Sequence, residues 1–185
     1  MKLDFLISDR SDAELVREVR SGQVESFNIL VRRWERRVYS YLVYLTGRRE
    51  DAFDMCQEVF LLAYRKLYQL REPDRFRYWL FRIAHNTAES NARQPDSEAT
   101  GASECRGEPA GAKVSGVRRW EPEELKILFE KALQELPVEQ RDAIVLKFYQ
   151  GFKLAEIAEI QGCPLSTAKT RLYSGFEALK KVIET

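Results

Sequence analysis

The chain has 185 residues, enough for one domain or two small helical ones. Hydrophobic residues make up 44% and charged residues 32%, so a core is feasible, and no apolar run is long enough to span a bilayer. Acidic residues interrupt the N-terminal segment, which excludes an ordinary signal peptide, and we expect a cytoplasmic protein. The formal net charge of +1 indicates no class of partner.

The first half of the chain predicts a bundle of four amphipathic helices. Ser11–Glu14 has the capping-box pattern that opens a short helix. Apolar residues then recur at steps of three and four in Phe27–Leu45, Ala52–Leu67 and Phe76–Thr87. The residues expected to end the first three helices are Gly22, Gly47 and Pro73.

Residues 94–119 lose this periodicity and are rich in Gly, Ala, Ser and Pro, which is typical of a flexible linker. Beyond it, Leu125–Leu136 forms another helical stripe, and Pro137 suits the first turn of a helix that continues to Gly151. No segment has the alternation of a strand. We therefore predict an all-α fold with a domain at 1–93, a linker at 94–120 and a second domain at 121–185.

Residues 153–173 predict a helix-turn-helix. The first helix has an apolar face in Leu154–Ile160, Gly162 suits its left-handed end, and Ser166 can cap a second helix buried through Ala168 and Leu172. The residues left facing outward are Thr167, Lys169, Thr170, Arg171 and Tyr173. Hydroxyls, cations and an aromatic ring suit a helix lying in the major groove of DNA. The alternative is a pair of surface helices in an all-α domain.

Charge is distributed unevenly between the two halves. Residues 1–95 hold 17 Lys and Arg against 14 Asp and Glu, whereas residues 121–185 hold 9 against 11. Because affinity for DNA depends on cations that neutralise phosphates, we expect the helix-turn-helix half to need a partner for strong DNA binding.

A second informative segment is residues 51–65. Its apolar stripe leaves a polar face that could dock a basic partner helix. The residues of this face are Asp51, Asp54, Gln57, Glu58 and Leu61. The alternative is a solvated helical face with a favourable acidic first turn.

A third segment, residues 70–86, interleaves arginines with aromatic residues. Tyr78 and Phe81 do not fit a single buried stripe, and we expect them to be partly exposed. Exposed rings beside arginines suit single-stranded nucleic acid, since bases stack on rings while guanidinium groups bind phosphates. A plain amphipathic core helix is the alternative.

Nothing in the sequence favours an enzyme. There is no glycine-rich phosphate loop and no catalytic triad, and His85 is the only histidine. Cys56, Cys105 and Cys163 are widely spaced, so we expect neither a disulfide framework nor a zinc site. We expect no metal and no cofactor.

In their order, the three segments resemble the extracytoplasmic-function (ECF) group of bacterial RNA polymerase sigma factors, in the sigma-70 family. Phe27–Asn86 is similar to sigma region two, with DAFDMCQEVFLLAYRKL as its polymerase-docking helix and FRYWLFRIAHNTA as its promoter-melting helix. Leu136–Leu179 is similar to sigma region four. The resemblance implies a region-two helix bundle and a region-four helix-turn-helix domain joined by the flexible linker.

The resemblance also implies partners and sites: core RNA polymerase, promoter DNA and an anti-sigma factor, with no membrane. Core polymerase would bind Asp51, Asp54, Gln57, Glu58 and Leu61. The minus-10 element would be bound by Leu70, Arg71, Arg77, Tyr78, Trp79, Arg82 and Asn86. The minus-35 element would be bound by Ser166, Thr167, Lys169, Thr170, Arg171, Tyr173 and Ser174.

The chain departs from the family where Ser174 and Phe176 replace common arginines and where residues 91–94 replace a basic segment. Fewer phosphate contacts follow from these differences. A free-standing helix-turn-helix transcriptional regulator is the alternative function. Such a regulator would need a ligand-binding or phosphoacceptor domain in place of the first half.

Overall fold

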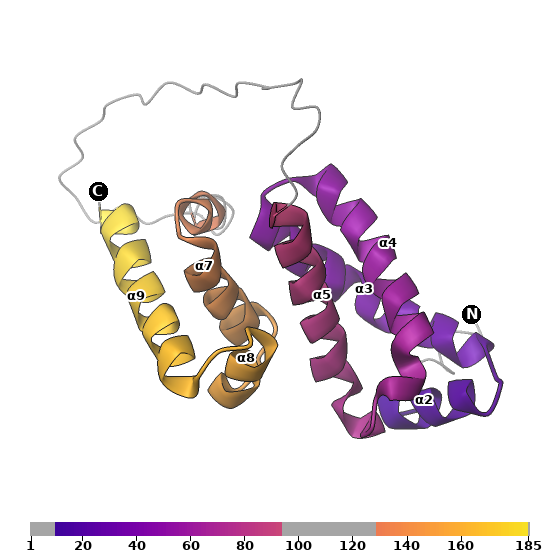
Figure 1. Cartoon of the computed structure of the whole chain (residues 1–185). Coiled ribbons are helices and arrows are strands. Elements are labelled where there is room, and N and C mark those ends of the chain that lie inside the picture. The colour runs from indigo at the N-terminus through magenta and orange to yellow at the C-terminus, as the bar shows by residue number, and fades with distance from the viewer. Residues whose placement is uncertain (1–9, 94–128, 185) are drawn as a thin grey trace.

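A computed structural model of the chain describes residues 10–93, the first half, and 129–184, the second half (Figure 1). The described residues are helical, with no strand among them, which confirms the all-α prediction. The elements of the first half are α2 (Asp12–Arg20), α3 (Glu25–Thr46), α4 (Arg49–Lys66), the short 3-10 turns η1 (Leu67–Gln69) and η2 (Pro73–Arg75), and α5 (Phe76–Arg93). The second half contains a helical run at residues 129–134, then α7 (Val138–Ile144), η3 (Val145–Tyr149), α8 (Leu154–Ile160) and α9 (Leu165–Glu184). The predicted linker at 94–120 lies outside the described residues.

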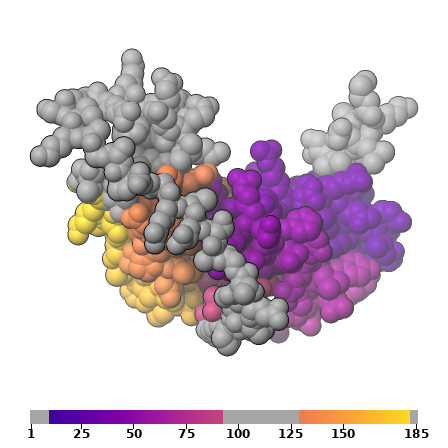
Figure 2. All heavy atoms as spheres, turned by 90° about the horizontal axis from the view of Figure 1, so that it is seen from above, coloured from indigo at the N-terminus to yellow at the C-terminus, as the bar shows by residue number. Residues whose placement is uncertain are grey.

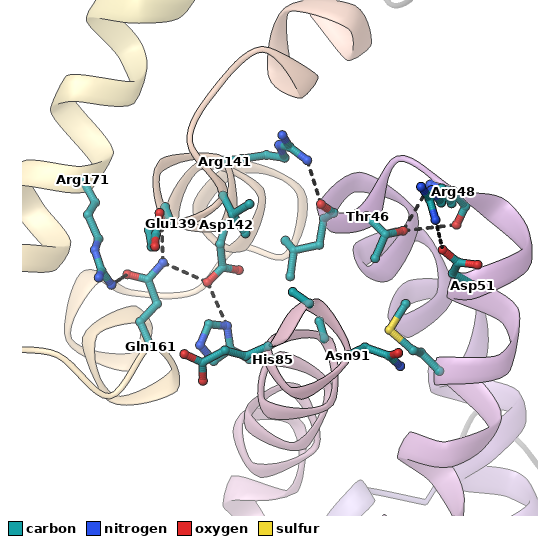
Figure 3. A pocket seen from close by; sticks show the side chains of 16 residues that line it. Thr46, Arg48, Asp51, His85, Asn91, Glu139, Arg141, Asp142, Gln161 and Arg171 are labelled. Atoms are coloured by element: carbon teal, nitrogen blue, oxygen red, sulfur yellow. Dashed lines mark hydrogen bonds and ion pairs between the residues drawn. The ribbon is translucent and has the colours of Figure 1, made fainter. Parts of the chain in front are cut away.

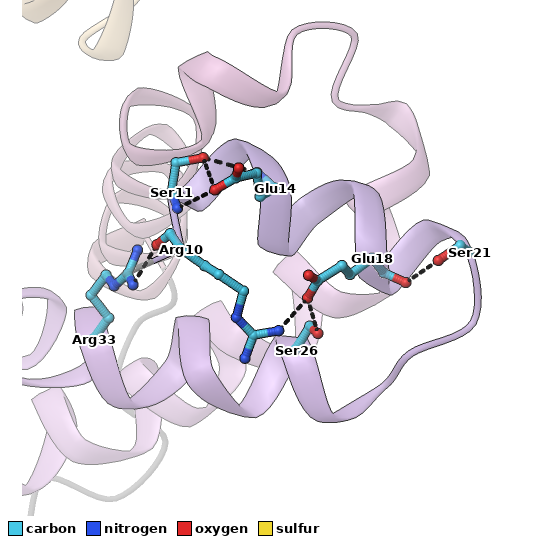
Figure 4. A network of polar contacts seen from close by, with 7 residues as sticks. All are labelled: Arg10, Ser11, Glu14, Glu18, Ser21, Ser26 and Arg33. Atoms are coloured by element: carbon cyan, nitrogen blue, oxygen red, sulfur yellow. Dashed lines mark hydrogen bonds and ion pairs between the residues drawn. The ribbon is translucent and has the colours of Figure 1, made fainter. Parts of the chain in front are cut away.

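The capping box at the start of α2 is confirmed. Ser11 Oγ accepts from the backbone N–H of Glu14 at 3.2 Å, and Glu14 Oε2 accepts from the backbone N–H of Ser11 at 2.7 Å. The bond from the Ser11 N–H, and a second one at 2.9 Å from the Ser11 hydroxyl, lower the pKa of the Glu14 carboxyl. At the other end of α2, Glu18 accepts from Arg10 at 2.7 Å and from Ser26 at 2.5 Å, so polar contacts fix the approach of α2 to α3 (Figure 4).

Helix α3 forms the centre of the first half, between α2, α4 and α5. Its buried side chains recur at helical spacing, and Leu30, Val38 and Tyr41 are fully buried. Gly47 ends the helix with φ 71°, as predicted, and its N–H bonds the Val43 carbonyl. Helix α4 ends before the predicted stop at Pro73, which instead opens the η2 turn.

One segment of the second half differs from the predicted continuous helix. Residues Val145–Tyr149 form a π-helical turn, in which the N–H of Gln150 bonds the Val145 carbonyl at 3.1 Å. The wider turn leaves Phe148 58% exposed, with its ring edge-on to Phe176 at 5.0 Å. Shortly beyond it, Phe152 is buried, at 2% exposed.

The helix-turn-helix is confirmed, with one correction at its second helix. Gly162 has φ 60°, the left-handed conformation that the turn requires. Helix α9 begins at Leu165, and the Pro164 carbonyl accepts from the Ala168 N–H at 3.1 Å. The predicted cap at Ser166 is therefore wrong, because the proline carbonyl already starts the hydrogen-bond ladder and Ser166 lies inside the first turn.

Arg141 is a structural residue that the sequence did not indicate. It is only 7% exposed and donates to the carbonyls of Leu133 at 2.8 Å, Gln134 at 2.8 Å and Leu136 at 3.0 Å. These carbonyls lie in the last turn of the helical run 129–134 and just beyond it, where the helix itself provides few donors. Arg141 also donates to the Leu45 carbonyl of α3 at 2.7 Å, so it links the two halves.

The two halves pack side by side and share one contiguous apolar core (Figures 1 and 2). Helix α8 lies against α5, and α7 lies against α3. Two aromatic pairs cross the boundary, Phe81 with Phe152 at 5.2 Å and Tyr44 with Tyr149 at 4.5 Å between ring centroids. The DNA-facing segments predicted in each half are therefore neighbours.

The left-handed glycine in the helix-turn-helix gives a stability prediction. No other heavy atom lies within 4 Å of the position of a Cβ at Gly162, so the penalty of substitution comes from φ alone. Gly162→Ala should lower the free energy of unfolding by about 1 kcal/mol, and Gly162→Asn by less, because asparagine tolerates this conformation. Urea unfolding of the two variants and the wild type measures these differences in the free energy of unfolding. Equal stability of Gly162→Ala and the wild type would contradict the turn geometry.

Candidate functional site

The face of α4 predicted to dock a partner is exposed along its whole length. Asp51, Asp54, Gln57, Glu58 and Leu61 are all exposed, while the intervening stripe of the helix is buried in the core. Asp51 of this face pairs with Arg48 at 3.5 Å, and both side chains are exposed. Such exposed pairs are weak, so the acids stay available to a basic partner.

Sequence reasoning predicted Leu61 but missed two other apolar residues of this face, Phe53 and Tyr64. Phe53 and Tyr64 are 57% and 41% exposed, and with Leu61, at 50% exposed, they follow one another at helical spacing along α4. The signal was present in the sequence, since Phe53 lies off the stripe that forms the core. Acidic and apolar groups on one face are typical of a protein-docking surface.

The residues predicted to bind the minus-10 strand differ in how far their side chains are exposed. Arg71, Arg82 and Asn86 are exposed, Arg77 and Trp79 are partly buried, and Leu70 and Tyr78 are buried. The Leu70 side chain is 5% exposed, and Arg20 donates to its carbonyl, which fixes the loop before η2. In this arrangement Arg71, not Leu70, is the loop side chain within reach of a ligand.

The expected exposure of Tyr78 and Phe81 is wrong. Tyr78 is 9% exposed and Phe81 is fully buried. Helix α5 is covered on two sides: Phe81 contacts Tyr41 of α3 at 5.3 Å and Phe152 of the second half at 5.2 Å between ring centroids. The prediction assumed that α5 buries one apolar stripe, which does not hold for a helix that is covered from two directions.

Arg77 lies at the boundary between the halves. Its guanidinium carbon is 4.2 Å from the centroid of the Phe152 ring and 5.9 Å from that of Trp34. Burial lowers the pKa of Arg77. Within the described parts of the chain, Arg77 Nε has no hydrogen-bond acceptor. A buried donor without a partner is unfavourable, so Arg77 has an unused capacity for a phosphate or carbonyl oxygen.

The outward face of α9 agrees with the helix-turn-helix prediction. Lys169, Thr170 and Tyr173 are exposed, and Lys169 Nζ lies 5.9 Å from the centroid of the Tyr173 ring. Thr170 Oγ1 donates to the Ser166 carbonyl at 3.0 Å. Ala168 and Leu172 are buried, as expected. Of the other predicted residues, Ser166 and Ser174 are exposed, and Thr167 and Arg171 are partly buried.

Arg171 differs from its neighbours on α9 because it points toward the other half. Its side chain is partly buried and donates to Gln161 Oε1 at 3.1 Å. It lies at a cavity of about 690 Å³ between the halves (Figure 3). The same cavity is lined by His85, Asp142 and Gln161.

A polar network in this cavity joins α3 and α5 to α7. Asp142 is fully buried, and its Oδ1 accepts from the Tyr41 hydroxyl at 2.8 Å. Its Oδ2 lies 3.1 Å from His85 Nδ1 and accepts from Gln161 Nε2 at 2.8 Å (Figure 3). The His85–Asp142 contact is an ion pair by distance, since His85 Nδ1 has no partner with hydrogen-bond geometry in the described residues. Sequence reasoning found no partner for His85, because Asp142 is distant in the chain.

The network shifts two pKa values. Burial lowers the pKa of His85, but the adjacent Asp142 carboxylate outweighs it, so the pKa lies above the usual 6.5. Burial, followed by the charge of Asp142, raises the pKa of Tyr41 well above its usual range, so its hydroxyl stays protonated and donates. Elsewhere, burial raises the pKa of Cys56 to about 11, as expected for a packing residue and not a reactive thiol.

Neither metal ligands nor a membrane span emerge from the described residues. No group of three or more His, Cys, Asp or Glu side chains in residues 10–93 and 129–184 could hold a metal ion. No helix in those ranges is long and apolar enough to cross a membrane.

Two family descriptions match the chain. Residues 30–97 match Sigma-70 region 2, and residues 126–179 match Sigma-70, region 4. The ECF RNA polymerase sigma-E factor of Escherichia coli strain K12 is 33% identical over 94% of this chain and 95% of its own length. The RNA polymerase sigma-H factor of Pseudomonas aeruginosa is 29% identical over 97% of each chain.

Solved structures of similar fold include CnrH and the sigma factor RpoE, each in a complex. CnrH, solved with the cytosolic domain of CnrY, has a TM-score of 0.68 at 23% identity, over 94% of this chain and 97% of that one. RpoE, solved with the anti-sigma factor NepR from Bartonella quintana, has a TM-score of 0.67 at 22% identity, over 87% and 98%. These likenesses support the fold.

The two matched models, which together cover most of both helical halves, place the chain in the sigma-70 class of transcription initiation factors. Within that class, the chain belongs to the ECF sigma factors of RNA polymerase, and it acts in promoter-specific initiation of transcription.

Proposed function

We propose that this sigma factor binds core RNA polymerase through α4, reads the minus-35 element with α9 and opens the minus-10 element with the loop at 70–75 and α5. The observation that carries the proposal is the α4 face, where every residue assigned to docking is exposed beside a buried core stripe. The domains at 1–93 and 121–185 would act as the two reading units, with the linker at 94–120 between them.

Docking would combine charge with apolar contact. Asp54 and Glu58 would steer a basic helix of the polymerase, and Phe53 and Leu61 would bury apolar area against it. This division suits a specific complex, because charge sets the orientation while the apolar side chains contribute most of the affinity.

Recognition of duplex DNA would depend on few cations. Lys169, Thr170 and Tyr173 are exposed on α9, and the half that carries them has 9 basic and 11 acidic residues. Binding to phosphates is therefore weak for the second half alone, and attachment to polymerase supplies the missing affinity as a high local concentration.

Strand capture would follow docking. Arg71, Arg82 and Asn86 are exposed near the rings of α5, where a base turned out of the duplex could be stacked and hydrogen-bonded. Turning a paired base out of the duplex costs a few kcal/mol, because the base loses its pairing and stacking. Contacts with the protein must recover that energy.

Other parts of the proposal follow from the family. The factor would work in the cytoplasm as a binding protein that catalyses no reaction itself. An anti-sigma factor is a proposed partner, since one relative of similar fold was solved with the anti-sigma factor NepR. A free-standing regulator is the less favoured function, because it gives the exposed acidic and apolar face of α4 no role.

Charge reversal tests the docking face. Asp54→Lys with Glu58→Lys should weaken binding to core polymerase by about 3 kcal/mol, or roughly 100-fold in Kd, through like-charge contact. Fluorescence anisotropy of the labelled factor with core polymerase measures this. The matched control is Glu25→Lys with Glu35→Lys, two exposed acids on α3. Equal affinity of the two double variants would refute the docking assignment.

Alanine substitution tests strand capture. Asn86→Ala and Arg71→Ala should each slow promoter opening roughly tenfold, because a lost base contact is worth about 1 to 3 kcal/mol. Permanganate reactivity of thymines at the minus-10 element gives the rate. Ser90→Ala, an exposed change farther along α5, serves as the control. Leu70→Ala is unsuitable, because it would also remove a core side chain.

Run-off transcription by core polymerase and this factor on a pool of promoters tests the function as a whole. Specific transcripts that require the factor are expected. Tight sequence-specific binding of the factor alone to duplex DNA, without any such transcripts, would instead favour the free-standing regulator.

A further inference from the structure

Asp142 is a buried charge whose partners come mostly from the other half of the chain. Its side chain is fully buried on α7. Tyr41 of α3 donates to one of its oxygens at 2.8 Å, and His85 of α5 lies 3.1 Å from the other. Among the described residues of its own half, Gln161 alone donates to it, at 2.8 Å.

A buried carboxylate is tolerated only when hydrogen bonds and opposite charge replace its lost hydration. Asp142 meets that condition when α7 lies against α3 and α5, in the packing where Tyr41 and His85 reach it. Sliding one half along the other would remove Tyr41 and His85 from the carboxylate and leave it buried with the Gln161 amide as its remaining described partner. The contact therefore fixes a particular arrangement of the halves.

That arrangement covers part of the surface proposed to capture the minus-10 strand. Glu159 of α8 pairs with Arg75 at 2.8 Å, and the Phe152 ring lies under the Arg77 guanidinium at 4.2 Å. Phe152 is 2% exposed. Arg77 Nε stays without an acceptor in the described residues, so the covered arginine is not fully satisfied in this form.

The same arrangement is incompatible with reading both promoter elements at once. Their names place them about 25 base pairs apart, which is about 85 Å of duplex at roughly 3.4 Å per base pair. The halves touch through Arg75 and Glu159, and a compact domain of 100 residues has a radius of gyration of only about 13 Å. The halves must separate before α5 and α9 can reach their elements together.

We propose that Asp142, Tyr41 and His85 form a latch that holds the free chain in a closed resting form, with part of its strand-binding surface covered. The role of the covered surface rests on the proposed function; the latch itself rests on the contacts between the halves. Gln161 extends the latch to the proposed minus-35 residue Arg171, to which it is hydrogen-bonded at 3.1 Å. Opening would uncover Arg77 and expose the cavity that Arg171 lines.

The latch is tighter when His85 is protonated, because the imidazolium then faces the Asp142 carboxylate. The charged groups around it are Asp142 and Glu139 of α7, Arg171 of α9, Glu89 of α5, Arg141, Arg48 and Asp51. The pKa of His85 is raised in the closed form, so protonation stabilises closing. This stabilisation is present below the usual pKa of 6.5 and is lost as the pH rises through the raised value.

Single-molecule energy transfer on the full chain tests the latch. The native cysteines are replaced, and dyes are attached through Gln69→Cys and Glu177→Cys, two exposed positions in different halves. The wild-type chain should be mainly in the high-transfer closed form. Asp142→Asn should raise the ratio of open to closed molecules about tenfold or more, because the amide cannot accept all the bonds of the carboxylate.

Glu135→Gln, which removes one negative charge from an exposed site in the same half, is the matched control and should leave the ratio unchanged. Tyr41→Phe is the second variant: it keeps the ring in the core and removes only the hydroxyl, and it should also favour opening. If circular dichroism shows that Asp142→Asn loses helix, Tyr41→Phe decides the question. A ratio equal to that of the wild type in a folded variant overturns the latch.

Changing pH and adding polymerase complete the test. From pH 8 to pH 6 the closed fraction should rise in the wild type and stay constant in His85→Gln; a flat wild-type response removes His85 from the latch. Excess core polymerase should convert closed molecules to open ones, and a closed complex overturns the resting-form proposal. Run-off transcription distinguishes failure of the proposed function from failure of the latch. If the chain closes but supports no transcripts, only the proposed function is refuted. If the chain supports transcripts but is never closed, only the latch is refuted.

Discussion

The buried carboxylate of Asp142 constrains the arrangement of the whole chain. Each half has apolar helices that could pack in several ways, because apolar contact is not directional. The Asp142 oxygens accept from Tyr41 and Gln161 and face His85, and together these contacts allow one register of α7 on α3 and α5. Arg141, next in sequence, adds a bond to the Leu45 carbonyl. Polar contacts thus select among arrangements that the hydrophobic effect makes favourable.

Helix α5 depends most on that constraint. Leu80 and Ala84 pack in the core of the first half, while Phe81 also meets Phe152 of the second. An aromatic-rich helix of this kind can serve two surroundings, the partner half in one form and unpaired bases in another, because rings pack equally well against rings and bases. The orphaned Nε of Arg77 is consistent with that double use.

The helices and their ends could be predicted from the sequence because those signals are local: the Ser11 capping box, the left-handed Gly47 and Gly162, and the exposed face of α4. What could not be predicted is the packing between distant segments. The π-helical turn at Val145–Tyr149 and the buried Tyr78 and Phe81 depend on the other half. No spacing in the sequence brings Asp142 to His85, since only the folded arrangement makes them neighbours.

Exposure in the closed form also bears on the order of events at a promoter. The α4 face, including Asp54, Glu58 and Phe53, lies open to solvent, whereas Arg77 is partly covered and Arg171 is held by Gln161. Polymerase could therefore engage α4 before the halves separate, and binding that favours the separated halves would shift the population toward the open form. A closed chain would then meet DNA with an incomplete set of contacts. Selective initiation would follow, because the surface proposed to capture the minus-10 strand becomes fully available only on the polymerase.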